Sequence, residues 1–364
     1  MKLAIIRGTN LNPWEMQFYS RLKEYDIFPT GICAKDNAFD VSAIDMPVTR
    51  LKRVKNINKI PGLSHGISYF FCVNERLINL KKTLKDFDVV NTVESYNTFS
   101  FQAVKSGKPV VVTSWETIPF NNQRTMYKHF KNTVNKEAKH FIAVSKKAKL
   151  VLMKEGVNEE RISVVPAGLD TERFSPMEKD REMLEKLNID KDKKIVLFAG
   201  RLEESKGILD LAKAMQGINA ILLVAGSGPL KDEIKKQSKR IDIRLLDSIP
   251  YSDMPKVHNL ADIFCLPSRP TKRWEEQFGY VLVEAMSCGK PVISTTSGAI
   301  PEVVSDDRVL VGPGNVQGFH HLIKTILDND ELRKRLGKKN RERAETVFKD
   351  SIVAEKLAKV FNGI

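Results

Sequence analysis

The chain is poor in cysteine and lacks any long apolar run. It has 364 residues, and its four cysteines lie far apart, at Cys33, Cys72, Cys265 and Cys288. This is neither the dense disulfide framework of a small secreted domain nor a paired metal site, so we expect reduced thiols in a cytoplasmic protein. No run of about 18 apolar residues exists, and none therefore predicts a membrane-spanning helix. Residues 1–15 contain too short an apolar stretch for a signal peptide and fit a first β-strand better.

Several catalytic motifs are missing as well. There is no Walker-type loop, no Gly-x-Ser-x-Gly elbow and no zinc pattern among the six scattered histidines. The two Asp-x-Asp triplets, Asp190–Asp192 and Asp328–Asp330, could in principle hold a divalent cation on a diphosphate. Neither triplet follows a predicted strand, so we interpret both as solvated loops and expect no metal or other cofactor.

Acidic residues are scarce in the first half of the chain. The net charge is +14, and residues 1–168 hold 26 Lys and Arg against 15 Asp and Glu, an excess of +11. This half should meet something anionic: a lipid surface, a phosphorylated acceptor or nucleic acid. No aromatic-rich basic groove or nucleic-acid motif occurs, so we expect no nucleic-acid partner.

Short apolar runs alternate with helical patterns from end to end, which indicates parallel strands joined by right-handed βαβ connections. The predicted strands are 2–7, 89–93, 109–114, 140–145, 161–166, 193–200, 219–226, 242–247, 262–268 and 290–295. The fold class is therefore α/β, with two doubly wound Rossmann-like domains that face each other across a cleft.

A charged, proline-containing segment separates the two sets of strands. We expect an N-terminal acceptor-side domain at 1–166, a linker at 167–192, a C-terminal donor domain at 193–346 and a last helix at 347–364, which could return to the N-terminal domain. Ligands of such sheets bind at the carboxyl ends of the strands.

The segment Phe278–Gly289 reads as a buried helix that nevertheless carries an acid, Glu284. A buried carboxylate is costly unless partners satisfy it, and ribose hydroxyls would be suitable partners. Glu276 lies just before this helix, whose free N–H groups could hold a pyrophosphate. The ordinary alternative is a glutamate that points into solvent.

Two cations, Arg201 and Lys206, follow the strand at 193–200 and could clamp a diphosphate. Alternatively, each is a solvated surface residue. Gly226 ends the next strand in "VAGSGP", where a missing Cβ would let the backbone approach a nucleotide, although a plain tight turn fits equally well.

As a set, these motifs resemble the retaining glycosyltransferases of family 4, which have the GT-B fold. The resemblance covers about residues 140–310 and rests on "GR" with "KG", "VAGSGP", "LPS", the Glu276-x7-Glu284 spacing, "EAMSCGKPVI" and "GAIPEVV". It implies that Arg201 and Lys206 bind the donor diphosphate, that Glu284 binds the ribose and that Glu276 binds the transferred sugar. It further implies catalytic roles for Glu276, Arg201 and Lys206. The donor-binding set it implies is Gly200, Arg201, Lys206, Gly226, Phe278, Gly279, Leu282 and Glu284.

The first domain departs from the family pattern. Its first loop, "RGTNLNPWE", has Gly8 alone instead of a glycine-rich stretch, and Trp115 and Glu116 stand where many members have a histidine. We consider Gly8, Asn10 and Glu116 as acceptor-side candidates. Their alternatives are a turn, a helix cap and a solvated loop acid.

The function that the resemblance implies is metal-independent transfer of a hexose from a nucleotide sugar to a glycan, lipid-linked or phosphorylated acceptor, as in polysaccharide biosynthesis. A phosphorylase or epimerase using the same cleft, or a non-catalytic binder of anionic lipid or polymer, is the alternative. The basic segment 124–149, with Met126, Phe130 and Val134 at helical spacing, could touch the inner face of the cell membrane as a peripheral helix, or it could simply pack on the domain.

Overall fold

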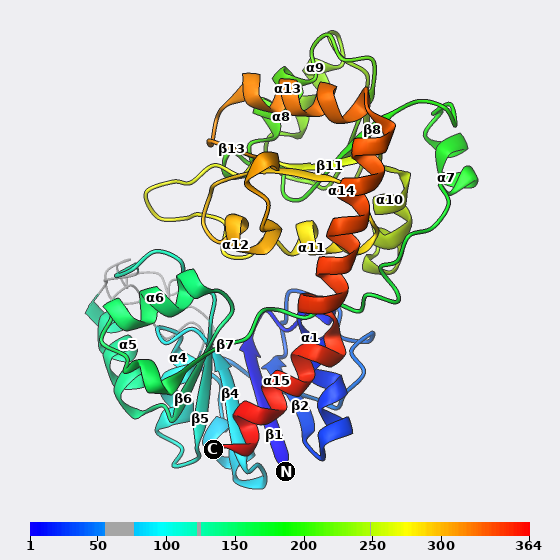
Figure 1. Ribbon diagram of the computed structural model, residues 1–364. Helices are drawn as coiled ribbons and strands as arrows, with labels where there is room; N and C mark the ends of the chain where they lie inside the picture. Colours follow the sequence, from blue (N-terminus) through cyan, green and yellow to red (C-terminus); the bar gives the residue numbers. More distant parts are fainter. Residues whose placement is uncertain (55–75, 122–124, 248) are drawn as a thin grey trace, which may run out of the picture. The chain divides into compact units, whose positions relative to one another are not determined.

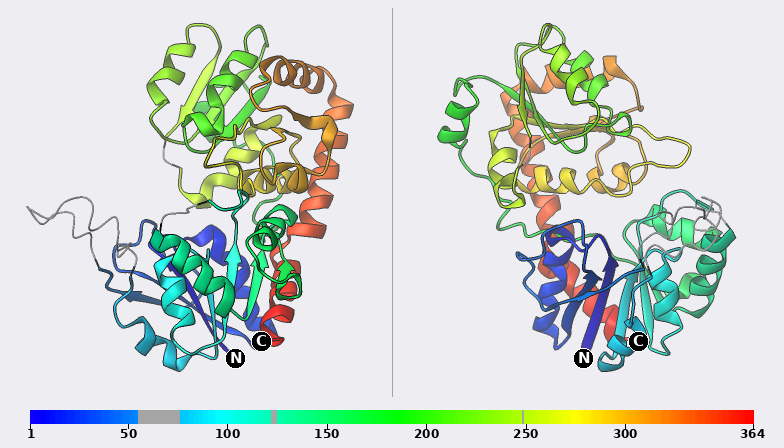
Figure 2. Two further views of the ribbon diagram at one scale, coloured as in Figure 1. Left: turned by 90° about the vertical axis from the view of Figure 1, so that its left-hand side faces the viewer. Right: turned by 180° about the vertical axis from the view of Figure 1, so that it is seen from behind.

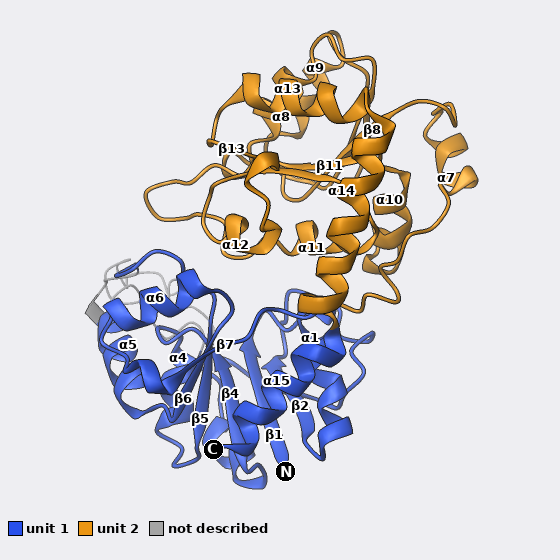
Figure 3. Cartoon of the chain, viewed as in Figure 1, with its two compact units in different colours: residues 1–168, 350–364 blue, residues 169–349 orange. Residues whose placement is uncertain are grey.

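The chain forms two compact units, each built around its own parallel sheet. A computed structural model describes residues 1–54, 76–121, 125–247 and 249–364 (Figure 1). Unit 1 contains residues 1–168 and 350–364, and unit 2 contains residues 169–349 (Figure 3). Of the segment 167–192, all but the first two residues therefore belong to unit 2. Each sheet carries helices on both faces (Figure 2).

Unit 1 has a seven-stranded sheet in the order β3-β2-β1-β4-β5-β6-β7, with every pair parallel. Its strands are β1 (Lys2–Gly8), β2 (Phe28–Ala34), β3 (Val48–Leu51), β4 (Val89–Val93), β5 (Val110–Ser114), β6 (His140–Ala143) and β7 (Ile162–Val164). Its helices are α1 (Pro13–Ser20), α3 (Leu80–Thr83), α4 (Thr98–Val104), α5 (Thr125–Glu137), α6 (Lys146–Lys154) and α15 (Asp350–Asn362). The last helix, α15, packs against α1, and Arg21 pairs with Asp350 at 2.5 Å.

Unit 2 has a six-stranded parallel sheet in the order β10-β9-β8-β11-β12-β13. Its strands are β8 (Ile195–Ala199), β9 (Ile221–Ala225), β10 (Ile243–Leu246), β11 (Ile263–Leu266), β12 (Val292–Thr295) and β13 (Leu310–Val311). Its helices are α7 (Arg181–Lys186), α8 (Ile208–Ala214), α9 (Lys231–Gln237), α10 (Met254–Leu260), α11 (Tyr280–Ser287), α12 (Ile300–Val304), α13 (Val316–Leu327) and α14 (Asp330–Arg343).

The strand order reverses once in each sheet. The chain builds outward from β1 to β3 and then crosses to the other side of β1 to add β4; in unit 2 it does the same between β8 and β11. Open α/β sheets bind ligands at this switch point, beyond the carboxyl ends of the two strands. The two places to search for a site are therefore the loops after β1 and β4 and the loops after β8 and β11.

Of the strands that the described residues form, the sequence located ten and missed three. β2 contains Pro29 and Gly31, which weaken a strand prediction, while β3 and β13 have only four and two residues. The predicted helix at 278–289 begins two residues later, at Tyr280, because Gly279 has a φ of 80° and lies outside the helix.

The basic segment 124–149 is not a single membrane-facing helix. It contains α5, β6 and the start of α6, and Phe130 and Val134 of α5 are buried, so the apolar stripe of that helix packs on the domain core. Lys131 is buried too and pairs with Glu155 at 2.5 Å. In the described residues no helix is both long and apolar enough to cross a bilayer.

Candidate functional site

Lys206 lies in the loop after β8, in a short 3-10 turn at Glu204–Lys206. Its Nζ is 2.8 Å from Oε2 of Glu276 and 4.4 Å from the centre of the Trp274 ring. The side chain is only 14% exposed. An ammonium held between a carboxylate and an aromatic face is fixed in position, which suits a charge that must meet a ligand.

Glu276 is the second half of this pair and comes from the loop after β11. Its Oε2 also accepts a hydrogen bond of 2.7 Å from the Ser268 hydroxyl. Its carbonyl accepts from the N–H of Ala299 at 2.9 Å, and a Cβ on Gly298 would lie 1.8 Å from that same carbonyl oxygen. The backbone around Glu276 is therefore tightly enclosed, and only a glycine fits at position 298. The β8–β11 switch point thus carries a nearly buried cation–carboxylate pair.

Glu284 is buried in α11 and is not a solvent-facing glutamate. It is 3% exposed, and its Oε2 is 3.0 Å from Nε2 of His258 in α10. The His258 ring is fully buried against Phe174 and Phe264, and its Nδ1 has no hydrogen-bond partner. With a proton on Nε2, this contact is a hydrogen bond from the His258 ring to the Glu284 carboxylate. From the sequence, we expected only ribose hydroxyls of a ligand to satisfy the Glu284 carboxylate. In the structure, His258 of the protein itself is one of its partners.

Arg201 is placed differently from Lys206. Its side chain is 70% exposed and lies 3.0 Å from Glu203, in the same loop after β8. Gly200 and Gly226 close the ends of β8 and β9 against each other, since a Cβ on Gly226 would lie 2.0 Å from the Gly200 carbonyl oxygen. Close packing of two strand ends thus explains Gly226 without a nucleotide.

The remaining donor-side candidates are largely packing residues. Phe278 is 3% exposed and its ring meets that of Phe348 with centroids 5.8 Å apart, while Leu282 is fully buried. Gly279 precedes α11 with its positive φ. Helix α11 begins directly after this residue, and its first backbone N–H groups lie at the same switch point as Lys206 and Glu276.

The switch point of unit 1 carries a second buried polar cluster. Gly8 ends β1 with a φ of 58°, and Asn10 is exposed and turns back to donate its N–H to the Arg7 carbonyl. The cap of α1 is Asn12, not Asn10. Glu116 is 6% exposed, so the interpretation as a solvated loop acid was wrong. Burial raises its pKa above the ordinary value.

Glu94, which the sequence analysis missed, follows β4 and lies in the same cluster. It has a φ of 55°, and its carboxyl accepts from the Trp115 N–H at 2.7 Å and from the Ser114 hydroxyl at 3.2 Å. Burial, and secondly the charge of Glu116, raises the pKa of Glu94 to about 8. A strained backbone and a perturbed acid at a switch point are typical of functional sites.

Neither Asp-x-Asp triplet contributes to these clusters. Asp190, Asp192, Asp328 and Asp330 are all exposed. In the part of the chain that the structure describes, no three His, Cys, Asp or Glu side chains gather so that they could hold a metal ion. Cys33, Cys265 and Cys288 are buried free thiols, and Cys72 lies outside the described residues.

Comparison with known proteins shows matches to two family models, one in each half of the chain. The model for "Glycosyl transferases group 1" matches residues 179–343, and the model for "Glycosyltransferase Family 4" matches residues 34–173. The chain belongs to the family 4 glycosyltransferases. Both halves of the chain thus match a family model, including the first domain, although its loops around Gly8 and Trp115 depart from the pattern common in the family.

Relatives of the chain include two from Corynebacterium glutamicum. The D-inositol 3-phosphate glycosyltransferase is 32% identical over 225 residues, which are 56% of this chain and 52% of the relative. The GDP-mannose-dependent monoacylated alpha-(1-6)-phosphatidylinositol monomannoside mannosyltransferase is 30% identical over 208 residues, 54% and 55% of the two chains. The chain thus spans about half the length of the curated relatives it matches.

Solved structures share the GT-B fold along the whole chain. Anabaena Alr3699/HepE in complex with UDP superposes with a TM-score of 0.79 at 19% identity, covering 100% of both chains. The sucrose-phosphate synthase of Thermosynechococcus elongatus gives 0.74 at 18% identity, covering 100% of this chain and 98% of the other. Two Rossmann-like α/β units are therefore the architecture of this chain, as the sequence predicted.

Proposed function

We propose that the protein transfers a hexose from a nucleotide-diphosphate sugar to an acceptor, with retention at the anomeric carbon and without a metal ion. The observation that carries this proposal is the Lys206–Glu276 pair at the β8–β11 switch point, 2.8 Å apart and nearly buried. Family membership and the UDP and UDP-glucose complexes of a protein with the same fold support it.

Each residue of the pair has a role in breaking the bond between sugar and phosphate. Negative charge builds on the leaving diphosphate, and the Lys206 ammonium stabilises it; the exposed guanidinium of Arg201 leaves Glu203 and contacts the same group. Glu276 holds Lys206 in place through one oxygen and accepts from sugar hydroxyls with the other. Lys206 and Arg201 together supply the positive charge that a metal ion would otherwise supply.

Glu284 is proposed to bind the ribose of the donor. His258 holds one carboxylate oxygen, Oε2, in a fixed orientation. Among the described residues His258 is the side chain seen to bond this carboxylate, so the other oxygen is open to a ligand hydroxyl. A buried carboxylate with one satisfied oxygen is a better hydroxyl acceptor than a solvated one, because it does not have to be desolvated when the ligand binds.

The acceptor is proposed to be a phosphorylated or lipid-linked glycan bound by unit 1. The names of the two Corynebacterium relatives give an inositol phosphate and a phosphatidylinositol mannoside as their acceptors.

Unit 1 also exposes Phe120, Leu150 and Met153, at 55%, 56% and 36%. The last two lie on α6 among four lysines, and this surface suits contact with an anionic membrane. The apolar segment 63–71 of the sequence lies outside the described residues.

The first experiment is a panel of UDP-, GDP- and ADP-hexoses tested for thermal stabilisation of the protein. The preferred donor is then incubated with candidate acceptors, with and without EDTA, and the anomeric configuration of the product is read by NMR. A new glycoside with the donor's anomeric configuration, formed equally in EDTA, supports the proposal. Release of a sugar 1-phosphate or an epimerised nucleotide sugar would instead identify a phosphorylase or an epimerase.

Membrane contact is tested separately with vesicles. The wild type should sediment with phosphatidylglycerol-containing vesicles but not with pure phosphatidylcholine vesicles. Leu150→Glu with Met153→Glu should lose this binding, while Ile78→Glu, which changes another exposed apolar residue of unit 1, should keep it. Equal sedimentation of both variants would contradict the assignment of α6.

A further inference from the structure

Arg7 is a buried guanidinium at the carboxyl end of β1, on the switch point of unit 1. It is 3% exposed. Its Nη1 donates to the Asn91 side-chain oxygen and to the Ile6 carbonyl, both at 3.1 Å, and its Nη2 donates to the same Asn91 oxygen and to the Tyr19 hydroxyl at 3.0 Å. All these acceptors are neutral. The side chain is therefore held rigidly while its charge stays uncompensated by them.

The Glu15 carboxylate forms an ion pair with the Arg7 guanidinium but no hydrogen bond. Oε2 of Glu15 is 3.7 Å from Nε of Arg7, beyond hydrogen-bond distance, and the Glu15 side chain is 25% exposed. Nε itself is buried and has no hydrogen-bond partner. A buried donor on a charged group is strongly unfavourable unless an acceptor meets it, so this position calls for an oxygen, preferably an anionic one.

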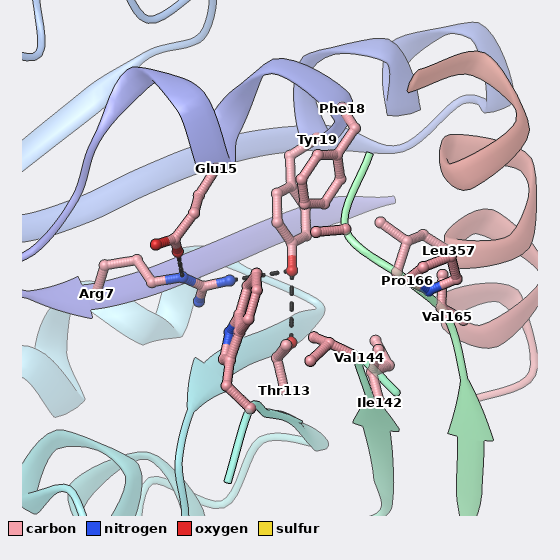
Figure 4. A pocket seen from close by; sticks show the side chains of 12 residues that line it. Arg7, Glu15, Phe18, Tyr19, Thr113, Ile142, Val144, Val165, Pro166 and Leu357 are labelled. Atoms are coloured by element: carbon pink, nitrogen blue, oxygen red, sulfur yellow. Dashed lines mark hydrogen bonds and ion pairs between the residues drawn. The ribbon is translucent and has the colours of Figure 1, made fainter. Parts of the chain in front are cut away.

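Arg7 lines a small cavity together with Glu15, Tyr19 and Thr113. Figure 4 shows Glu15 on one side of the Arg7 guanidinium and Tyr19 on the other, with Thr113 below the Tyr19 hydroxyl. The cavity measures about 10 Å³, room for a single oxygen atom or a water. Trp115 lines the same space, so an apolar indole stands next to the charged group.

We propose that Arg7 is the anion-binding group of the acceptor site: it takes one oxygen of a carboxylate or phosphate on the acceptor glycan, which replaces the carboxylate of Glu15. This inference rests on the proposed function, which places the acceptor on unit 1, and adds that the acceptor carries an acidic group close to its sugar ring. The β1–β4 switch point, the rigid guanidinium, the free donor and the cavity all lie at one place.

Glu15 has a defined role in this arrangement. Without an acceptor it is the charge that partly neutralises Arg7, at a distance that leaves Nε unbonded. Because it is a quarter exposed and comes from α1, it can move toward solvent when a stronger partner arrives. Glu15 therefore competes with the acceptor, and its removal should strengthen anion binding.

A double-mutant cycle with inorganic phosphate as the probe tests this directly. Glu15→Gln should bind phosphate about tenfold more tightly than the wild type, since the competing charge is gone. Arg7→Gln should weaken binding about 30-fold, and Arg7→Gln with Glu15→Gln should be as weak as Arg7→Gln alone. The control Lys23→Gln removes an exposed cation of the same unit and should change nothing. If Glu15→Gln leaves the phosphate affinity unchanged, or if the double variant binds like Glu15→Gln, the proposal is wrong and Arg7 serves the fold through a buried water.

Glucuronate, glucose 6-phosphate and glucose then serve as probes that carry the sugar. The wild type should bind the two acidic sugars at least tenfold more tightly than glucose, and Arg7→Gln should abolish that ratio. Equal affinities for all three in the wild type would overturn the proposal. Binding of nucleotide sugars is measured on the same samples. A wild type that binds no nucleotide sugar would contradict the proposed function. A wild type that binds nucleotide sugars but shows no preference for acidic sugars would contradict the role of Arg7 alone. Glu15→Gln changes a partly exposed side chain, so the test does not depend on whether Arg7→Gln folds.

Discussion

Nε2 of His258 lies 3.0 Å from Oε2 of Glu284, and both side chains are buried in unit 2. The two residues are 26 positions apart and come from α10 and α11. Their pairing explains how an apolar helix contains a carboxylate in the absence of any ligand. It also makes the orientation of that carboxylate depend on a residue outside the helix.

His258→Phe should therefore lower both stability and nucleotide affinity. The variant leaves a buried carboxylate oxygen without its donor, which costs about 1–3 kcal/mol of unfolding free energy. Chemical denaturation and titration with UDP, GDP and ADP measure the two effects. His258→Gln, which keeps an N–H near the same position, should recover part of each. The double variant, His258→Phe with Glu284→Gln, should lose less stability than the two single variants lose together. A loss equal to their sum would show that the two side chains do not depend on each other.

Lys206→Ala should leave the fold intact and slow transfer by about 10²–10³ in kcat, because a fixed cation near the leaving diphosphate is lost. Initial rates at saturating donor measure this. Lys186→Ala is the matched control, since Lys186 is 72% exposed in a surface pair with Glu182. Wild-type turnover by Lys206→Ala would remove the basis of the proposed mechanism.

Gly298→Ala should disturb the site through the backbone of Glu276. A Cβ at this position would lie 1.8 Å from the Glu276 carbonyl oxygen, so either residue must shift. Gly156→Ala is the control: its φ of 86° is also positive, but a Cβ there meets nothing within 4 Å. Gly156→Ala should cost about 1–2 kcal/mol from backbone strain alone. Gly298→Ala should cost more and should also lower the transfer rate, which thermal melts and initial rates can compare.

Glu94→Gln should change the pH dependence of stability. The pKa of Glu94 is raised to about 8 in the folded protein and returns to its ordinary acidic value on unfolding. Between about pH 5 and 8 the folded state therefore holds a proton that the unfolded state has lost, and the wild type loses stability as the pH rises. Glu94→Gln lacks this group, so relative to the wild type it should gain on the order of 3–4 kcal/mol from pH 5 to pH 8.

Urea unfolding at pH 5, 6.5 and 8 measures the difference. Glu116→Gln should reduce the loss of stability between pH 5 and pH 8 without removing it, because the charge of Glu116 is the second cause, after burial, of the raised pKa of Glu94. Parallel pH profiles for the wild type and Glu94→Gln would show that Glu94 is ionised in the folded protein throughout this range.

The sequence by itself determined the α/β class, ten of the strands and the burial of Glu284, because apolar runs and helical spacing are local properties of the chain. It also indicated Lys206 and Glu276, through motifs whose residue types and spacing are specific. It could not give their contact, because 70 residues separate them and the pair forms only where β8 lies beside β11.

Only the tertiary structure decided which groups satisfy the buried charges. His258 and Ser268 became partners of the two glutamates, Arg201 turned out exposed, and Glu94 and Arg7 met other residues at the β1–β4 switch point. Such partners come from elements far apart in sequence, and strand order brings them together. A carboxylate's or guanidinium's energy depends on those neighbours far more than on the residues beside it in the chain.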